Sequence, residues 1–278
     1  MKNLLLCLLM CFMATAVYKP VNAGETMPVI LTERGLEKHI AYVFNHIDFS
    51  NSECLSFDVF DKAYRGYLNL LNDGKLNDNK RILTICDLSV SANKNRMWII
   101  DLDTKKVLLN TLVAHGRGSG KEYATSFSNR NNTHKTSLGF YITGDTYDGD
   151  HGMSLHLYGM DAGFNSAAFD RGIVVHGAYY VSKQYIENNE NCLGRSWGCP
   201  AVPAKLSDMV INTIKDSTCL FIYYPEKRYM ARSHWLNKRV DHLPDTTPTK
   251  LSVPTIKEIT IEYVSASGNV DSVKTVRQ

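Results

Sequence analysis

A histidine and a cysteine, each beside a glycine, are the residues of this chain best suited to act together in catalysis. His176 ends an apolar run and precedes Gly177, whereas Cys199 follows Gly198 in a Ser-x-Gly-Cys segment. A free cysteine is only a few per cent thiolate near neutral pH, so it needs a base to act as a nucleophile. The glycine before it permits a sharp turn that exposes the sulfur and directs main-chain N–H groups at an oxyanion. The two segments therefore predict a thiol nucleophile with an imidazole base.

The order of these segments resembles the L,D-transpeptidase catalytic motif, in which His-Gly is followed downstream by Ser-x-Gly-Cys. The form Gly194-Arg195-Ser196-Trp197-Gly198-Cys199-Pro200-Ala201-Val202 is similar to a divergent branch, the murein L,D-transpeptidase catalytic domain proteins. Val113-Ala114-His115-Gly116 resembles the same branch, and so does the segment from Phe127 to Tyr141 that ends in Ser-Leu-Gly-Phe-Tyr. The resemblance covers residues 82–225.

This resemblance implies that Cys199 attacks a peptidoglycan stem tetrapeptide, with His176 as the base. D-Ala would leave, a thioester would remain on Cys199, and the amine of an acceptor stem would then take the acyl group. It further implies that the N–H groups of Gly198 and Cys199 bind the oxyanion. Ser196 is expected to fix the turn or to hydrogen-bond near the sulfur, and Gly177 to allow close backbone approach behind the histidine. No metal or organic cofactor is called for.

The chain departs from the commoner transpeptidase motif just after the nucleophile. That motif has an arginine two places beyond the cysteine, whereas Pro200 and Ala201 follow Cys199 here. Either another group, with Arg195 as the candidate, performs the task of that arginine, or the task is dispensed with. The residues expected to bind substrate are Arg195, Trp197, His156 and Ser137.

Two other functions remain open beside the transpeptidase. Water could replace the acceptor amine, which would make the chain an L,D-carboxypeptidase or a crosslink-cleaving cysteine hydrolase. The chain could also bind the wall without catalysis, although both His176 and Cys199 are present. Papain-like proteases are excluded because they place the cysteine before the histidine. Serine D,D-enzymes are excluded because the partners of a Ser-x-x-Lys motif, Ser-Asp-Asn and Lys-Thr-Gly, are absent.

Nucleotide, nucleic-acid and metal binding are all disfavoured. A net charge of +3 is far from the basic surface of a nucleic-acid-binding protein. The segment 116–121, Gly-Arg-Gly-Ser-Gly-Lys, fails as a phosphate-binding loop because Glu122 follows the lysine. His151 and His156 would face opposite sides of a strand, and the chain lacks a zinc-binding pattern. Residues 144–152 are expected to form a solvated loop, because their aspartates do not have the spacing of a calcium loop.

The chain is expected to be exported and to contain one main domain. Residues 1–23 have a basic start, an apolar run and a small-residue cleavage site, as in a signal peptide. This predicts a periplasmic or secreted protein of the cell envelope that contacts membrane only through an uncleaved signal. The resemblance implies that it acts on peptidoglycan stem peptides, and we expect it to be a monomer. The predicted parts are a helical segment over 24–79, a catalytic domain over 80–227 and an extension over 228–278. How Cys54, Cys86, Cys192 and Cys219 pair is left open.

The fold class predicted is mainly β with flanking helices. Apolar residues recur at helical spacing over residues 31–76, with Thr32 and either Ser56 or Asp58 as the first capping residues. Alternating runs predict strands near 82–88, 97–102, 107–113, 138–143 and 154–159. Strands are also expected at 172–175 and 219–224, a short helix or turn at 164–171, and an amphipathic helix at 203–214 that buries Met209. Residues 259–263 are expected to pair with the run after 267–269.

Overall fold

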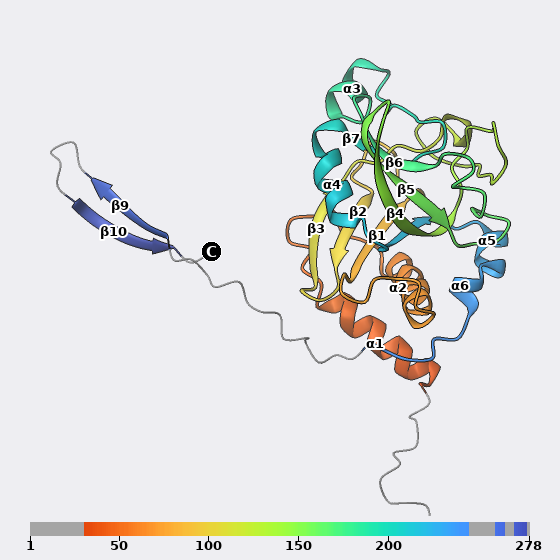
Figure 1. Cartoon of the computed structure of the whole chain (residues 1–278), viewed down its shortest axis with the longest axis horizontal. Coiled ribbons are helices and arrows are strands. Elements are labelled where there is room, and N and C mark those ends of the chain that lie inside the picture. Colours follow the sequence, from red (N-terminus) through yellow and green to blue (C-terminus); the bar gives the residue numbers. More distant parts are fainter. Residues whose placement is uncertain (1–30, 245–258, 265–269, 277–278) are drawn as a thin grey trace, which may run out of the picture. The chain divides into compact units, whose positions relative to one another are not determined.

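The computed structural model describes residues 31–244, 259–264 and 270–276, so the predicted signal peptide lies outside the described residues. Its centre is an eight-stranded sheet in the order β3-β2-β1-β8-β4-β5-β6-β7. The predicted β-rich fold class is therefore confirmed (Figure 1). The strands are β1 (Ile82–Asp87), β2 (Met97–Asp101), β3 (Lys106–Thr111), β4 (Gly139–Gly149), β5 (Gly152–Gly159), β6 (Val174–Ala178), β7 (Ala201–Pro203) and β8 (Cys219–Tyr223).

The two edges of this sheet come together, so that it nearly closes on itself. The chain that leaves β3 pairs with the chain around β7 through two isolated bridges, Ala114 with Ala201 and Gly116 with Ser196. The N–H of Ala114 donates to the carbonyl of Ala201 at 2.8 Å. Residues 196–201 are thus held between the end of the first edge and β6 on the other side.

Two helices precede the sheet, as the apolar spacing predicts. Helix α1 (Glu33–Asn45) is capped by Thr32, whose hydroxyl accepts the N–H of Gly35 at 3.1 Å. Helix α2 (Phe57–Asn72) lies against β1 and β8 (Figure 1). It buries Phe60, Tyr67 and Leu70 almost completely. Burial of a large apolar side chain contributes about 1.5–3 kcal/mol, so α2 is an integral part of the sheet's core.

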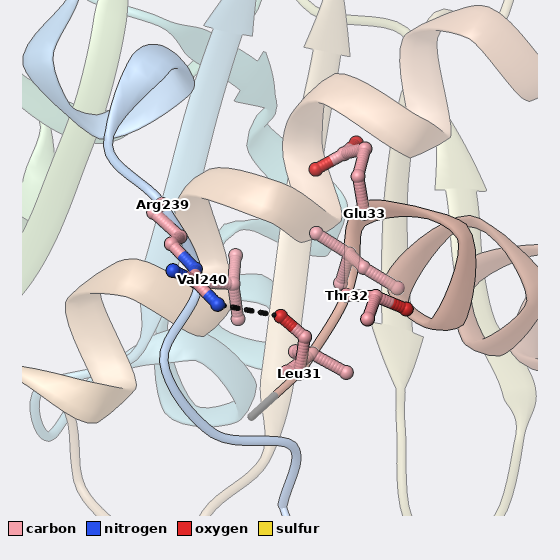
Figure 2. A pocket seen from close by; sticks show the side chains of 6 residues that line it. Leu31, Thr32, Glu33, Arg239 and Val240 are labelled. Carbon is pink, nitrogen blue, oxygen red and sulfur yellow. Dashed lines mark hydrogen bonds between the residues drawn. The ribbon is translucent and has the colours of Figure 1, made fainter. Parts of the chain in front are cut away.

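The chain after β8 packs back on these helices. Helices α5 (Lys227–Arg232) and α6 (His234–Asn237) follow, and the side-chain amide of Asn69 in α2 donates to the carbonyls of Trp235 and Lys238 at 2.9 Å each. Arg239 donates to the carbonyl of Leu31 at 2.9 Å beside a pocket of about 250 Å³ (Figure 2). The domain boundaries at 80 and 227 stay predictions, because both flanks pack on the same core.

Helix α4 (Ser207–Ile214) lies against β5 and β6 and faces the core with Val210, Ile211 and Ile214. The prediction that Met209 belongs to this face is wrong, since its side chain is 49% exposed. The cause is the geometry of α4 itself, because with 3.6 residues per turn a face formed by Val210, Ile211 and Ile214 leaves Met209 on the opposite side. Helix α3 (Lys183–Asn188) is part of the connection between His176 and Cys199 and is capped by Ser182.

The hairpin of β4 and β5 extends further than the sequence predicts. Residues 144–152 were expected to form a loop, but β4 continues to Gly149 after a shift of register between Thr143 and Thr146. A bulge bends a strand without ending it, so the polar run still pairs with β5. The turn at Asp150 and His151 is thereby carried beyond the bulge. Residues 162–172 form consecutive turns before β6, in line with the predicted helix or turn.

The predicted pairing near the C-terminus is confirmed. Strands β9 (Ile259–Val264) and β10 (Val270–Val276) form a two-stranded antiparallel sheet. In the part of the chain that the structure describes, no helix is sufficiently long and apolar to span a bilayer.

Candidate active site

The parallel pair of β6 and β7 places the predicted base beside the predicted nucleophile. His176 in β6 is opposite Ala201 in β7, so Cys199 lies two residues before the register partner of the histidine. Both residues line one pocket of about 560 Å³. The separation of the two segments along the chain is therefore bridged by strand pairing.

The imidazole of His176 is held in one orientation. Its Nδ1 lies 3.0 Å from the carbonyl oxygen of Gly177, and because a carbonyl only accepts, Nδ1 carries the proton. This leaves Nε2 with a lone pair. The ring of His151 stacks on it at a centroid distance of 4.5 Å and 19°. Burial lowers the pKa of His176, the Gly177 carbonyl opposes this, and the charge of His151 lowers it further, so the imidazole is neutral at pH 7.

The thiol of Cys199 is also neutral at rest. Burial raises its pKa, and the N–H of Val174 and the charge of Arg171 only partly offset that effect. Its Sγ donates to the carbonyl of Gly172 at 3.6 Å. Among the described residues, the hydrogen bonds do not join this thiol directly to His176. The site therefore contains a neutral thiol and a neutral base in one pocket, not a thiolate–imidazolium pair.

Ser196 builds the turn that carries the cysteine. Its hydroxyl donates to the carbonyl of Cys199 at 2.6 Å and accepts the N–H of Gly198 at 3.1 Å. Gly198 has φ +129°, which L side chains rarely adopt. Because the Gly198 N–H is already bound by Ser196, the two oxyanion donors expected from the sequence reduce to the N–H of Cys199.

A second histidine segment holds this turn from the opposite side. The N–H of Ser196 donates to the carbonyl of His115 at 3.0 Å, and the N–H of Arg117 donates to the carbonyl of Ser196 at 2.8 Å. A Cβ on Gly116 would lie 2.9 Å from the Cα of Gly198 and would clash with the carbonyl oxygen of His134. Gly116 is therefore required for the close approach of two backbones under the cysteine turn.

Gly177 plays a similar packing role on the other side of the site. A Cβ at this position would lie 2.8 Å from the side chain of Ser207 at the start of α4. The absence of a side chain lets β6 approach α4 closely behind His176, as expected from the sequence.

Arg195 and Trp197, both expected to bind substrate, line the pocket. Trp197 is 68% exposed, and the guanidinium of Arg117 lies 5.5 Å from the centroid of its ring. Arg195 donates to the carbonyl of Gly120 at 3.1 Å. These two residues form an aromatic and cationic rim beside Cys199.

The structure does not bring Ser137 or His156 into the pocket lining. Ser137 is completely buried, and its hydroxyl donates to the carbonyl of Ser128 at 2.8 Å. His156 pairs with Val174 in the sheet and stacks on Tyr147 at a centroid distance of 4.5 Å, two strand positions beyond Ser154. Tyr147 and Ser154 do line the pocket, so His156 lies next to it, on the same face of β5 as Ser154, without lining it.

Arg171 and His151 are two of the pocket residues that the sequence reasoning missed. Arg171 precedes the strand that carries His176, and His151 was considered only as a metal ligand. Both lie in turns, where no periodic pattern reports the direction of a side chain. The only sequence signal was their place: Arg171 just before β6, and His151 at a hairpin tip.

Among the described residues, no group of three or more histidine, cysteine or acidic side chains is placed to hold a metal ion. Cys54, Cys86, Cys192, Cys199 and Cys219 are all free thiols in the structure.

Comparison with known proteins connects this site to a family. The family model described as the L,D-transpeptidase catalytic domain matches residues 51–223, which include His176 and Cys199. A search of curated proteins found no match.

Two solved structures are similar to parts of the chain. An L,D-transpeptidase from Mycobacterium smegmatis is 10% identical with a TM-score of 0.32, covering 52% of this chain and 59% of that protein. An L,D-transpeptidase (Yku) from Stackebrandtia nassauensis is 12% identical with a TM-score of 0.31, covering 68% and 89%. The match to the family model over residues 51–223 is the finding that decides: this chain belongs to the L,D-transpeptidase catalytic domain family.

Proposed function

We propose that this chain is an exported, cysteine-dependent peptidoglycan L,D-transpeptidase. The observation that carries the proposal is the single pocket shared by Cys199 and by a His176 whose Nε2 is left free. The family acts on peptidoglycan stem peptides, and the predicted signal peptide would deliver the chain to the cell envelope. The proposed enzyme acts as a monomer.

The first half-reaction begins from the neutral pair. His176 Nε2 takes the proton of Cys199, and the sulfur attacks the carbonyl carbon of the diamino acid that precedes the terminal D-Ala. The resulting oxyanion accepts the N–H of Cys199. As the intermediate collapses, the C–N bond breaks, the imidazolium returns its proton to the leaving amine, and D-Ala departs. A thioester on Cys199 remains.

The second half-reaction uses the same groups in reverse. The side-chain amine of an acceptor stem attacks the thioester carbonyl and loses a proton to His176. The C–S bond breaks, and the imidazolium returns that proton to the sulfur. The new amide joins two stems, and the resting thiol is restored. Arg195 and Trp197 at the rim are the proposed contacts for the stem peptide.

The thiol must turn before this chemistry can start. Its present acceptor is the carbonyl of Gly172, and rotation about the Cα–Cβ bond of Cys199 redirects the S–H within the pocket. Hydrogen bonds between catalytic groups are often loose in a free enzyme and tighten when substrate binds. Substrate occupancy is therefore expected to bring Sγ to Nε2.

Intact mass and muropeptide analysis together test the proposal. Incubation with a carbapenem should give an adduct that is lost in Cys199→Ala and kept in Cys54→Ala, which removes another free cysteine. A tetrapeptide donor with an acceptor amine should then give crosslinked product. Release of D-Ala without crosslinks, at any acceptor concentration, would identify a hydrolase instead. If neither adduct nor turnover is seen, the catalytic proposal fails.

A further inference from the structure

Arg171 stands out among the pocket residues because its backbone neighbour already touches the thiol. It lies at the end of the turns that precede β6 and lines the same pocket as Cys199 and His176. The carbonyl of the next residue, Gly172, accepts the S–H of Cys199. Arg171 is therefore the residue next to the backbone carbonyl that accepts the S–H of Cys199.

The guanidinium of Arg171 binds only uncharged groups. It donates to the carbonyls of Ser128 and Lys135 at 2.9 Å each and to the hydroxyl of Ser137. No carboxylate among the described residues lies within ion-pair distance of it. Its positive charge is thus held in place without being neutralised, on the wall of a half-enclosed pocket.

The same guanidinium packs on the cysteine turn. A Cβ on Gly198 would lie 3.4 Å from Nη2 of Arg171 and 3.0 Å from the carbonyl oxygen of Lys135. That oxygen is the one that accepts Nη2–H of Arg171. The guanidinium, the Lys135 carbonyl and Gly198 therefore form one packed unit beneath Cys199. Ser137 also belongs to this unit, since its hydroxyl accepts a hydrogen bond from the guanidinium.

Arg195 is placed differently, although the sequence made it the candidate for the missing motif arginine. It belongs to the rim and is bound to the carbonyl of Gly120. The titratable groups on the wall besides Arg171 and Cys199 are Tyr147, Asp150, His151, His176, Tyr180 and Arg195. Of these, none lowers the pKa of Cys199 noticeably, whereas Arg171 does, acting after the stronger opposing effect of burial and the N–H of Val174.

We infer that Arg171 is a positioning residue of this site: its guanidinium fixes the turn that carries Cys199 and holds an unneutralised positive charge on the wall of the same pocket. The inference rests on the proposed role of Cys199 as nucleophile. Arg171, which lies just before β6, would then replace the arginine that follows the cysteine in the commoner motif and that is missing here. A fixed guanidinium there stabilises the sulfur anion as it forms and does not need to touch substrate.

Thiol alkylation tests this without any peptidoglycan. The rate of iodoacetamide labelling at Cys199 is measured from pH 6 to 10 by peptide mapping, in a Cys54→Ser background because Cys54 is exposed. Arg171→Gln should raise the apparent thiol pKa by about one unit and slow labelling near pH 7 by about tenfold. The matched control, Arg195→Gln, removes an equal charge from the same pocket and should leave the pKa within about 0.3 units.

Arg171→Lys keeps the positive charge but removes the planar guanidinium, so it separates these two contributions. It also replaces Arg171→Gln as the test if that variant does not fold. It keeps the charge, so labelling near neutral pH should stay within about threefold of the parent. An unchanged profile in Arg171→Gln, an equal shift in Arg195→Gln, or a tenfold slowing in Arg171→Lys would each overturn the inference. Because labelling needs no turnover, failure here is distinct from failure of the carbapenem and muropeptide tests.

Discussion

Two of the histidine–glycine pairs of this chain, His115-Gly116 and His176-Gly177, lie on either side of the cysteine turn, and their surroundings give them opposite properties. His115-Gly116 holds the turn from one edge of the sheet, and His176-Gly177 faces it from β6. In His115, Nδ1 accepts a hydrogen bond from Arg96 at 2.8 Å. In His176, Nδ1 instead donates to a carbonyl. The same dipeptide thus supports structure at one site and presents a lone pair to a pocket at the other.

The buried cation explains the difference. Arg96 is completely buried and also donates to the carbonyls of Val90 and Val113. Burial lowers the pKa of His115, and the charge of Arg96 lowers it further, to about 3, against a smaller opposing effect of the Gly120 backbone. His115 therefore stays a neutral acceptor throughout the physiological range. A catalytic histidine needs the reverse, a neighbour that leaves one nitrogen free to gain a proton.

The largest difference in effect between the two histidine–glycine pairs should come from replacing His176, the proposed base. His176→Gln should reduce kcat/KM for transpeptidation by about 10²–10⁴-fold, because general base catalysis is lost. The free energy of unfolding should change by less than about 1 kcal/mol, since the ring borders a pocket. Steady-state kinetics and urea unfolding measure the two effects. Activity within threefold of wild type would show that His176 is not the base.

Substitution of each glycine by alanine should lower the free energy of unfolding by different amounts. Gly116→Ala should lower the free energy of unfolding by about 2–3 kcal/mol, because the new Cβ meets backbone atoms that cannot rotate away. Gly177→Ala should cost about half as much, since its nearest neighbour is the side chain of Ser207. Urea unfolding of both variants compares them directly. Equal losses would contradict the tighter backbone approach at Gly116.

Removal of the structural histidine should affect stability more than chemistry. His115→Ala leaves a guanidinium N–H of buried Arg96 without its acceptor, which costs about 1–3 kcal/mol in the free energy of unfolding. The folded His115 has a pKa near 3, below the value of 6.5 for an unperturbed histidine. The unfolded chain binds the extra proton between these values, so the wild type loses stability as pH falls from 6.5 toward 3.

His115→Ala should have a weaker decline of stability across that window, and unfolding at several pH values between 4 and 7 measures it. An identical pH dependence in wild type and variant would show that another group carries the effect. Such a result would also remove the electrostatic contrast between the two histidines.

The smallest effect should come from the stacked ring beside the base. Burial first and the charge of His151 second lower the pKa of His176, so the acid limb of kcat/KM should lie below 6.5. His151→Gln removes that charge, and the acid limb should move upward by a few tenths of a pH unit. A pH–rate profile of both proteins checks the direction. A downward shift would contradict the proposed coupling of the rings.

Local patterns in the sequence determined much of this protein. The spacing of apolar residues predicted α1, α2 and most strands, since amphipathic periodicity depends on the residue's own helix or strand. The segments around His176 and Cys199 predicted a thiol nucleophile with an imidazole base, because a thiol, an imidazole and flanking glycines have few other uses together. The bulged continuation of β4 was missed, since pairing with β5 outweighed its polar, glycine-containing sequence.

Only the tertiary structure decided which groups meet. It distinguished His176 from His115 by a buried Arg96 and replaced Ser137 with Arg171 at the pocket wall. It also showed that Ser196 binds the Gly198 N–H that the sequence had assigned to an oxyanion. Protonation and donor availability depend on burial and on partners distant along the chain, and these exist only after the sheet has brought its two edges together.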